Sequence, residues 1–447
     1  SVDFHRVNNM AKRSNVRWII FFLMLMLGAI NYIDRASLSI ALPYISEEFG
    51  LHDAQVIGFI QSGFFWAYAL MQIPAGMLAD RFKKRTIIAL AAISWGIAQA
   101  MVAVCTGVYS LFVARVALGV TESPIMPAGA KLMGTWLTPN ERGRGSMLLD
   151  GGAPLGTAVG AIVITALIAF FNDWRMAFVI AGGVTVALGI VVWWYIRNTP
   201  AEHPGVNPQE LNYLTEANGA AEQKHLPPTF KEIKQCLAQR NVIALICGWC
   251  SYSTVFYGLM TWLPFYLQKD RDLNLKDMGM AMAFIFFLCF IGQMLGGYLM
   301  DKLRKRGYKD NTVFHSFLSV SAIAAGVGVY LAAQATSPMA VIMWLGVAIF
   351  GLRWCSVYWS IPSLLGAQKM AGSIVGIMNF SSNIWSAIVP IVIGYLVYIT
   401  GNYYSSMMLF VAAAVVYLIS SLMINFDRPI TVGERHSEPA KHPLTQR

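Results

Sequence analysis

Two charged residues, Asp34 and Arg35, lie side by side within a stretch from Trp18 to Leu42 that is otherwise almost wholly apolar. At ~1.5 Å of helical rise per residue, such a stretch matches the ~30 Å hydrocarbon core of a bilayer and is typical of a membrane-spanning helix. A charge near the bilayer centre costs ~2.5–3.5 kcal/mol, so adjacent charges are expected only where they face a bundle interior or a water-filled cavity. We therefore interpret this pair as part of a functional site, and of a transport pathway in particular.

Most other charged residues inside the apolar stretches extend this pair into a balanced set of three acids and three arginines. Its members are Asp34, Glu122, Asp150, Arg35, Arg115 and Arg353. Left unpaired, they would cost roughly 15–20 kcal/mol, so pairing or hydration must remove most of this cost. Lys131 is set aside because it lies near the end of its span, where its long side chain can reach the interface.

Arg115 and Glu122 are seven residues apart, two turns along one helix face and about 10 Å in rise. Each is therefore expected to meet another helix. One arrangement has Arg115 holding Asp34 and Glu122 facing the cavity. The alternative is a static network of buried ion pairs that fixes helix packing, although such pairs stabilise poorly compared with apolar contacts.

Asp34 and Glu122 are the candidate proton carriers. Burial favours the neutral form of a carboxyl and a nearby arginine favours the charged form, so protonation should respond when a partner leaves or an anion arrives. None of the seven histidines lies in the middle of an apolar stretch, which disfavours a histidine relay.

The composition predicts an all-α polytopic membrane protein. Of the 447 residues, 56% are hydrophobic and 13% are charged, against about 25% charged in a soluble domain. Mean hydropathy is +0.54. No cleaved signal peptide is expected, because residues 1–15 are polar and no small-residue cleavage site follows them. Twelve spans are predicted, near 17–41, 54–79, 86–106, 110–137, 145–171, 174–196, 241–268, 277–301, 312–334, 338–366, 371–399 and 403–425.

The net charge of +10 is a topology signal rather than a sign of nucleic-acid binding. Of 33 Lys and Arg residues, 25 lie in segments on the side of the two termini and four lie on the opposite side. By the positive-inside rule, both termini are expected in the cytoplasm of a cell whose plasma membrane, a bacterial inner membrane, holds the protein. Six scattered cysteines, including Cys247 and Cys250 in an apolar span, indicate buried thiols rather than a disulfide framework or a metal site.

The chain is predicted to fold as two six-helix halves, 17–197 and 241–425, joined by a proline-rich linker, 198–240, with tails at 1–16 and 426–447. A motif running from Gly76 through Asp80 and Arg81 recurs 221 residues later, from Gly297 through Asp301. Both copies fall on the same side, so the halves are parallel repeats with a substrate site expected between them near the midplane. We predict that Asp80, Arg81 and Asp301 act in gating as the halves rock.

These motifs resemble the major facilitator superfamily, and within it the anion:cation symporter family, which includes bacterial galactonate, glucarate and hexuronate permeases and vesicular glutamate and sialic acid carriers. The resemblance covers roughly 17–425. The residues that carry it are Asn31-Tyr32-Ile33-Asp34-Arg35, Arg115-x3-Gly119-x2-Glu122-Ser-Pro124-x2-Pro127, Trp136-Leu-Thr-Pro139-Asn-Glu141-Arg142 and Thr199-Pro200-Ala-Glu202-His203-Pro204-Gly205-Val206.

The resemblance implies that Arg35 binds the substrate carboxylate, that Asp34 and Glu122 take protons and that Arg115 tunes them. By the same resemblance, the residues that contact the sugar acid in the bacterial permeases correspond here to Tyr32, Tyr68, Ser356, Trp359 and Asn379. Ala153 and Tyr358 depart from the galactonate-type pattern, and Asp150 and Arg353 are additional to it. Either these two charges pair across the halves as a gate, or Arg353 binds a second carboxylate of a dianion.

Polar side chains at helical spacing follow three spans. The stripes are Gln61, Tyr68 and Gln72; Arg353, Ser356 and Ser360, with Trp359 beside them; and Asn379, Ser382, Asn383 and Ser386. Each could be hydrogen-bonding glue between helices. Together with the arginines they suit a hydroxylated anion.

We therefore expect a proton-coupled symporter, a monomer, that imports a small organic anion of the sugar-acid type by alternating access. Na⁺ coupling is left open, and no cofactor is expected. The alternative is a proton-coupled antiporter that exports drugs or metabolites, since Gly151-Gly-Ala-Pro154-Leu-Gly156 faintly resembles an antiporter motif, although helix packing explains these glycines as well. An enzyme is disfavoured, because the sequence contains no nucleophile–base pair, metal-ligand set or phosphate loop.

Overall fold

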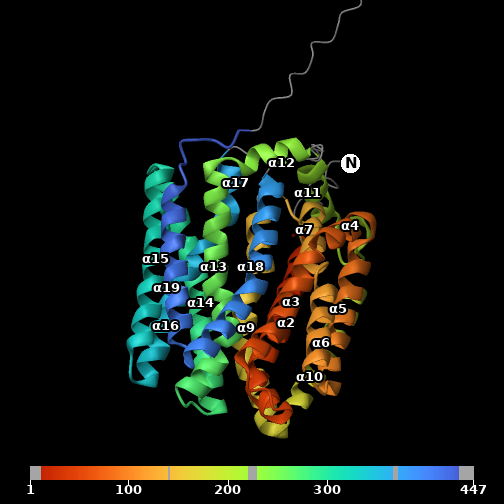
Figure 1. The fold of residues 1–447 in the computed structure, drawn as a ribbon. Helices are drawn as coiled ribbons and strands as arrows, with labels where there is room; N and C mark the ends of the chain where they lie inside the picture. The colour runs from red at the N-terminus through yellow and green to blue at the C-terminus, as the bar shows by residue number, and fades with distance from the viewer. Residues whose placement is uncertain (1–11, 139–140, 220–228, 366–370, 432–447) are drawn as a thin grey trace, which may run out of the picture.

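The computed structural model describes residues 12–138, 141–219, 229–365 and 371–431, and in these ranges its regular secondary structure is helical throughout (Figure 1). Eleven helices in the described ranges are long and apolar enough to cross a membrane. The pair α3 and α4, bent by 44° at Met71, makes a twelfth span. The predicted all-α polytopic fold is thus confirmed.

The first six spans run from α2 to α10, and several are broken into two helices. They are α2 (Val16–Phe49), α3 (Ala54–Leu70) with α4 (Gln72–Arg81), α5 (Lys84–Met101) with the short η1 (Val102–Val104), α6 (Val108–Glu122) with α7 (Ile125–Trp136), α8 (Arg142–Asp150) with α9 (Gly152–Phe171), and α10 (Trp174–Tyr195).

The linker forms one 3-10 turn and two helices, and six further spans follow it. The linker elements are η2 (Pro200–Glu202), α11 (Pro208–Gly219) and α12 (Phe230–Leu237). The spans are α13 (Arg240–Phe265) with η3 (Tyr266–Asp270), α14 (Leu275–Lys305), α15 (Asp310–Gln334), α16 (Pro338–Leu352) with η4 (Arg353–Ser360) and α17 (Ile361–Leu364), α18 (Ala371–Thr400) and α19 (Tyr404–Met423).

Both ends of the described chain and the linker helices lie at one end of the bundle, which we call the termini face (Figure 1). The linker is anchored to the first half by a buried ion cluster on this face. Arg17 at the start of α2 pairs with Glu141 at 3.2 Å and with Glu210 of α11 at 3.3 Å. Since all three residues are 5% exposed or less, α11 should move with the first half.

The two halves approach most closely toward the opposite face of the bundle. A Cβ on Gly58 of α3 would lie 2.5 Å from the carbonyl oxygen of Pro390 in α18, and one on Gly394 would lie 2.4 Å from the carbonyl oxygen of Ala54. Near the same face, Lys269 pairs with Glu47 at 3.4 Å. The halves are thus packed backbone to backbone on the side away from the termini.

The glycine-rich start of α9 serves close packing within the first half. A Cβ on Gly152 would lie 2.5 Å from the backbone of Gly28, and one on Gly156 would lie 2.2 Å from the carbonyl oxygen of Ala29. Small residues let the backbones of membrane helices touch in this way. Close packing against α2 therefore accounts for the glycines of this segment, and no antiporter motif is needed to explain them.

Candidate substrate and proton site

Arg35 lies at the centre of the first half and forms an ion pair with Glu122. Its Nε donates to Oε2 of Glu122 at 3.2 Å, and the side chains are 4% and 0% exposed. Arg35 comes from the middle of α2 and Glu122 from the last residue of α6, so this contact joins two spans. Glu122 therefore supplies the counter-charge of the arginine, and its Oε1 has no hydrogen-bond partner.

Three aromatic rings enclose the Arg35 guanidinium. Its central carbon lies 4.5 Å from the ring centre of Tyr32, 4.5 Å from that of Phe64 and 4.7 Å from that of Tyr68. A guanidinium is weakly hydrated and stacks well on such rings, which lowers the cost of burying it. The rings leave the charge to be balanced by a carboxylate at the edge of the group, where Glu122 now lies.

Asp34 faces away from this ion pair, toward α5 and α10. Its Oδ2 accepts from Trp95 Nε1 at 2.6 Å and from Thr185 Oγ1 at 2.9 Å, while its Oδ1 is buried without a partner. The carboxyl is 0% exposed. Asp34 is thus held by two neutral donors, and one of its oxygens has no hydrogen-bond partner.

Arg115 differs from the sequence-based expectation that it would hold the Asp34 carboxylate. Its guanidinium donates instead to the backbone carbonyl oxygens of Asp34 at 3.4 Å and of Arg35 at 3.1 Å. The reason lies in the helix geometry, because Asp34 projects toward Trp95 while Arg115 reaches the backbone of α2 from α6. Arg115 therefore holds the α2 backbone at the segment that carries Asp34 and Arg35.

Several residues around this centre were missed from the sequence. Trp95 and Gln99 lie four residues apart on α5, and Gln99 Nε2 donates to Ser37 Oγ at 2.6 Å. That pairing of a tryptophan and an amide on one helix face was the available signal. Thr185 gave no signal, since a threonine in an apolar helix is common.

Tyr32 connects the site to the second half. Its hydroxyl lies 2.9 Å from the hydroxyl of Tyr257 in α13. The Tyr257 ring also packs edge-on against Phe65 of α3 at 5.3 Å between centres. Of the predicted site residues of the first half, Tyr32 thus lies at the interface between the halves.

Asp150 and Arg353 are brought together across this interface. Arg353 Nη2 donates to Asp150 Oδ2 at 3.1 Å. Arg353 Nε also donates to Gln293 Oε1 at 3.1 Å, and its Nη1 donates to the Tyr252 hydroxyl. The ion pair that the gate hypothesis requires is therefore present, and Gln293 and Tyr252 complete it.

The region around Arg353 differs from the predicted α-helix. Residues Arg353–Ser360 form a 3-10 helix, in which residues three apart lie above one another. Arg353, Ser356 and Trp359 consequently share a face, whereas Ser360 is exposed and its hydroxyl donates to the carbonyl oxygen of Val357. The stripe predicted to include Ser360 was wrong for this reason.

The remaining predicted residues are placed as follows. Asn379 in α18 is half-buried, and its side-chain oxygen accepts from Asn383 at 3.5 Å. Arg81 and Asp301, predicted to act in gating, are both exposed near the termini face. The side chain of Asp80, like Pro139 and Asn140 of the sequence motif, lies outside the described residues.

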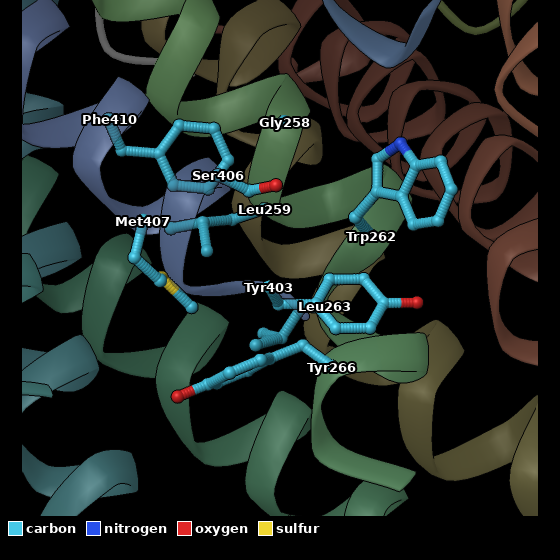
Figure 2. Close-up of a pocket in the computed structure, with 9 residues that line it drawn as sticks. All are labelled: Gly258, Leu259, Trp262, Leu263, Tyr266, Tyr403, Ser406, Met407 and Phe410. Atoms are coloured by element: carbon cyan, nitrogen blue, oxygen red, sulfur yellow. The ribbon is translucent and has the colours of Figure 1, made fainter. Parts of the chain in front are cut away.

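A small cavity in the second half is unrelated to these residues. It has a volume of about 10 Å³ and lies between α13 and α19, lined by Gly258, Leu259, Trp262, Leu263, Tyr266, Tyr403, Ser406, Met407 and Phe410 (Figure 2). This is about the space of one water molecule, far too small for a sugar acid. A search of the described residues finds no group of His, Cys, Asp and Glu placed to hold a metal ion.

Comparison with known proteins places the chain among transporters. Residues 24–390 match the family model for the Major Facilitator Superfamily. A probable sulfoacetate transporter of Cupriavidus necator is 30% identical over 440 residues, which cover 97% of this chain and all of that protein. A probable galactarate/D-glucarate transporter of Bacillus subtilis is 28% identical over 434 residues, 94% of each chain. A D-galactonate transporter of Escherichia coli is 27% identical, over 87% of this chain and 91% of its own.

A solved structure shares the fold. A bacterial homolog of the human lysosomal transporter Spinster, in an inward-facing and unoccupied conformation, superposes with a TM-score of 0.72 at 19% identity. The match covers 93% of this chain and 99% of that one. The relatives are named as transporters of organic anions, as the sequence motifs indicated. The chain belongs to the major facilitator superfamily, a family of membrane transporters and not of enzymes.

Proposed function

We propose that the protein is a proton-coupled symporter that imports a small organic anion of the sugar-acid type. The observation that carries this proposal is the buried Arg35, caged by three rings and balanced by the single carboxylate of Glu122. Such a guanidinium offers a bidentate site for a carboxylate. Relatives named as galactarate, glucarate and galactonate transporters support the choice of substrate class.

The proposed cycle exchanges one carboxylate for another at Arg35. When the substrate carboxylate approaches, Glu122 takes a proton and releases the guanidinium, because two carboxylates beside one buried arginine would leave excess negative charge. Asp34 binds a second proton at the oxygen that has no partner. The proton on Glu122 offsets the charge of the bound carboxylate, which lowers the cost of moving the loaded site between the two faces.

The hydroxyl groups around Arg35 suit a polyhydroxylated chain. Tyr32 and Tyr257 present their hydroxyls at the interface, and Ser356 and Asn379 are half-buried polar residues of the second half. We propose that these groups bind the substrate hydroxyls. With the termini face in the cytoplasm, the face on which the two halves are packed backbone to backbone is the outer one. Transport then proceeds by alternating access at the site between the halves.

The test is uptake into proteoliposomes that contain the full chain. An inward acid gradient should drive accumulation of labelled D-galactonate or D-glucarate, and Arg35→Ala should abolish it. Glu47→Gln is the matched control, since it removes a carboxylate from an exposed ion pair far from the site. Uptake that persists after the gradient is collapsed would exclude proton coupling. Acid-driven efflux of substrate would indicate an exporter.

A further inference from the structure

Arg353 is a second buried arginine at the interface, and its counter-charge comes from the other half. Its side chain is 5% exposed and contacts the Asp150 carboxylate, the Gln293 amide oxygen and the Tyr252 hydroxyl. Gln293 and Tyr252 belong to the second half and are neutral. The Arg353 guanidinium is therefore held in place by residues of the second half, and its charge is balanced by Asp150 of the first half.

Asp150 is the accessible member of this cluster. Its side chain is 34% exposed, whereas Arg353 is 5% and Gln293 is 8% exposed. It lies at the last position of α8, where Gly151 separates α8 from α9. Gln293 Nε2 donates to the same Asp150 oxygen, at 3.2 Å. An anion that reached Arg353 would thus replace the partly exposed Asp150 carboxylate. It would accept hydrogen bonds from the same two donors, Arg353 Nη2 and Gln293 Nε2.

Movement of the halves would separate Arg353 from its counter-charge. The Asp150–Arg353 contact is 3.1 Å long, so a relative shift of about 1 Å would take it out of hydrogen-bond range. A buried guanidinium that loses its counter-charge is strongly destabilising. Since the substrate is the one anion that the transport cycle itself delivers, a substrate carboxylate is the natural replacement.

Helix α13 contributes neighbours to the surroundings of both arginines. The Arg35 guanidinium stacks on Tyr32, whose hydroxyl contacts Tyr257. The Arg353 guanidinium lies 5.2 Å from the ring centre of Phe256, the residue before Tyr257 in α13. Each arginine is paired with one carboxylate of the protein, Arg35 with Glu122 and Arg353 with Asp150.

We propose that Arg353 is a second anion-binding residue and that Asp150 is its tethered stand-in, displaced when a dianionic substrate binds. This inference rests on the proposed function and deepens it, because it names the substrate class as an organic dianion with an acid group at each end. A sugar monoacid presents only a neutral hydroxyl to Arg353 and cannot displace Asp150.

The test measures dissociation constants of the purified full chain for matched acids: D-gluconate with D-glucarate, and D-galactonate with galactarate. The wild type should bind each diacid roughly 10- to 100-fold more tightly than its monoacid, the value of one charge-assisted contact. Arg353→Gln should remove this preference. Asp150→Asn should tighten diacid binding several-fold, because the competing carboxylate is gone.

The double variant Asp150→Asn with Arg353→Gln protects the test against misfolding, since it leaves no unpaired charge. It should bind both acids of a pair alike. Glu47→Gln, at another ion pair between the halves, should keep the wild-type preference. Equal binding of monoacid and diacid by the wild type, retention of the preference without Arg353, or weaker diacid binding by Asp150→Asn would each overturn the inference while the function stands. Binding of no acid at all would overturn the proposed function with it.

Discussion

Replacing Asp34 by asparagine should leave the stability of the fold nearly unchanged and abolish the coupling of transport to protons. The Asp34 Oδ2 accepts from Trp95 and Thr185 at 2.6 and 2.9 Å, and the Oδ1 has no partner. In Asp34→Asn the amide oxygen can accept both hydrogen bonds, and the amide nitrogen takes the place of the unpartnered oxygen. Since both bonds are retained, the free energy of unfolding should change by about 1 kcal/mol or less. The site that takes the proton is nevertheless gone.

Trp95→Phe is the opposite case. It removes the donor and leaves the Asp34 oxygen with one bond fewer, so it should cost about 1–3 kcal/mol of stability. Because the carboxyl remains, coupling should persist in the fraction that folds. Comparing the two variants therefore separates the effect of losing the proton-binding carboxyl from the effect of losing a hydrogen bond to it.

The assay compares two modes of transport in proteoliposomes. Acid-driven accumulation requires net proton movement, whereas exchange of external labelled for internal unlabelled substrate does not. Asp34→Asn should lose accumulation and keep exchange within about threefold of the wild type, a difference of under 1 kcal/mol in the barrier. Wild-type accumulation by this variant would refute the role of Asp34. Loss of exchange in a stably folded variant would instead place Asp34 in substrate binding.

Three further predictions concern packing, gating and the linker. Gly156→Ala should destabilise the protein by about 1–3 kcal/mol, because its Cβ would lie 2.2 Å from the α2 backbone, whereas Gly76→Ala has nothing within 4 Å and should be neutral in a thermal-unfolding assay. Gly58→Val should wedge open the face opposite the termini and raise the labelling rate of cysteines placed in the interface there. The His203 ring packs edge-on against Trp136 and Tyr195, and burial lowers its pKa, so stability is lost as pH falls below about 6.5. Amide protection of residues 199–206 should therefore fall with acidification in the wild type and not in His203→Gln.

The sequence predicted the architecture well, because apolar length and the doubled motif are properties of the chain alone. Twelve spans follow from runs of apolar residues, and the motif at Gly76 and Gly297 indicates two parallel halves. The break at Arg353 could not be read in this way. A 3-10 turn and an α-helix accept the same residues, so the sequence does not distinguish them. In the structure the segment packs closely against α14, where a Cβ on Gly296 would lie 2.5 Å from the Trp354 side chain.

The sequence predicted which residues form the candidate site better than it predicted which partners those residues contact. Charges in apolar spans identified Asp34, Arg35 and Glu122, because such residues are costly and rarely placed without a reason. Helical spacing gives the direction of a side chain around its own helix but not which neighbour it meets. The pairing of Arg35 with Glu122, and of Arg115 with the α2 backbone, depends on the packing of α6 against α3, which only the folded structure provides.

The most direct test of the account is the affinity of the purified protein for a sugar acid and for the corresponding uncharged alditol. The central claim is that the Arg35 guanidinium binds the substrate carboxylate. The wild type should bind D-galactonate at least roughly 10-fold more tightly than galactitol, and Arg35→Gln should bind the two alike. An unchanged preference for the acid in Arg35→Gln would contradict the claim.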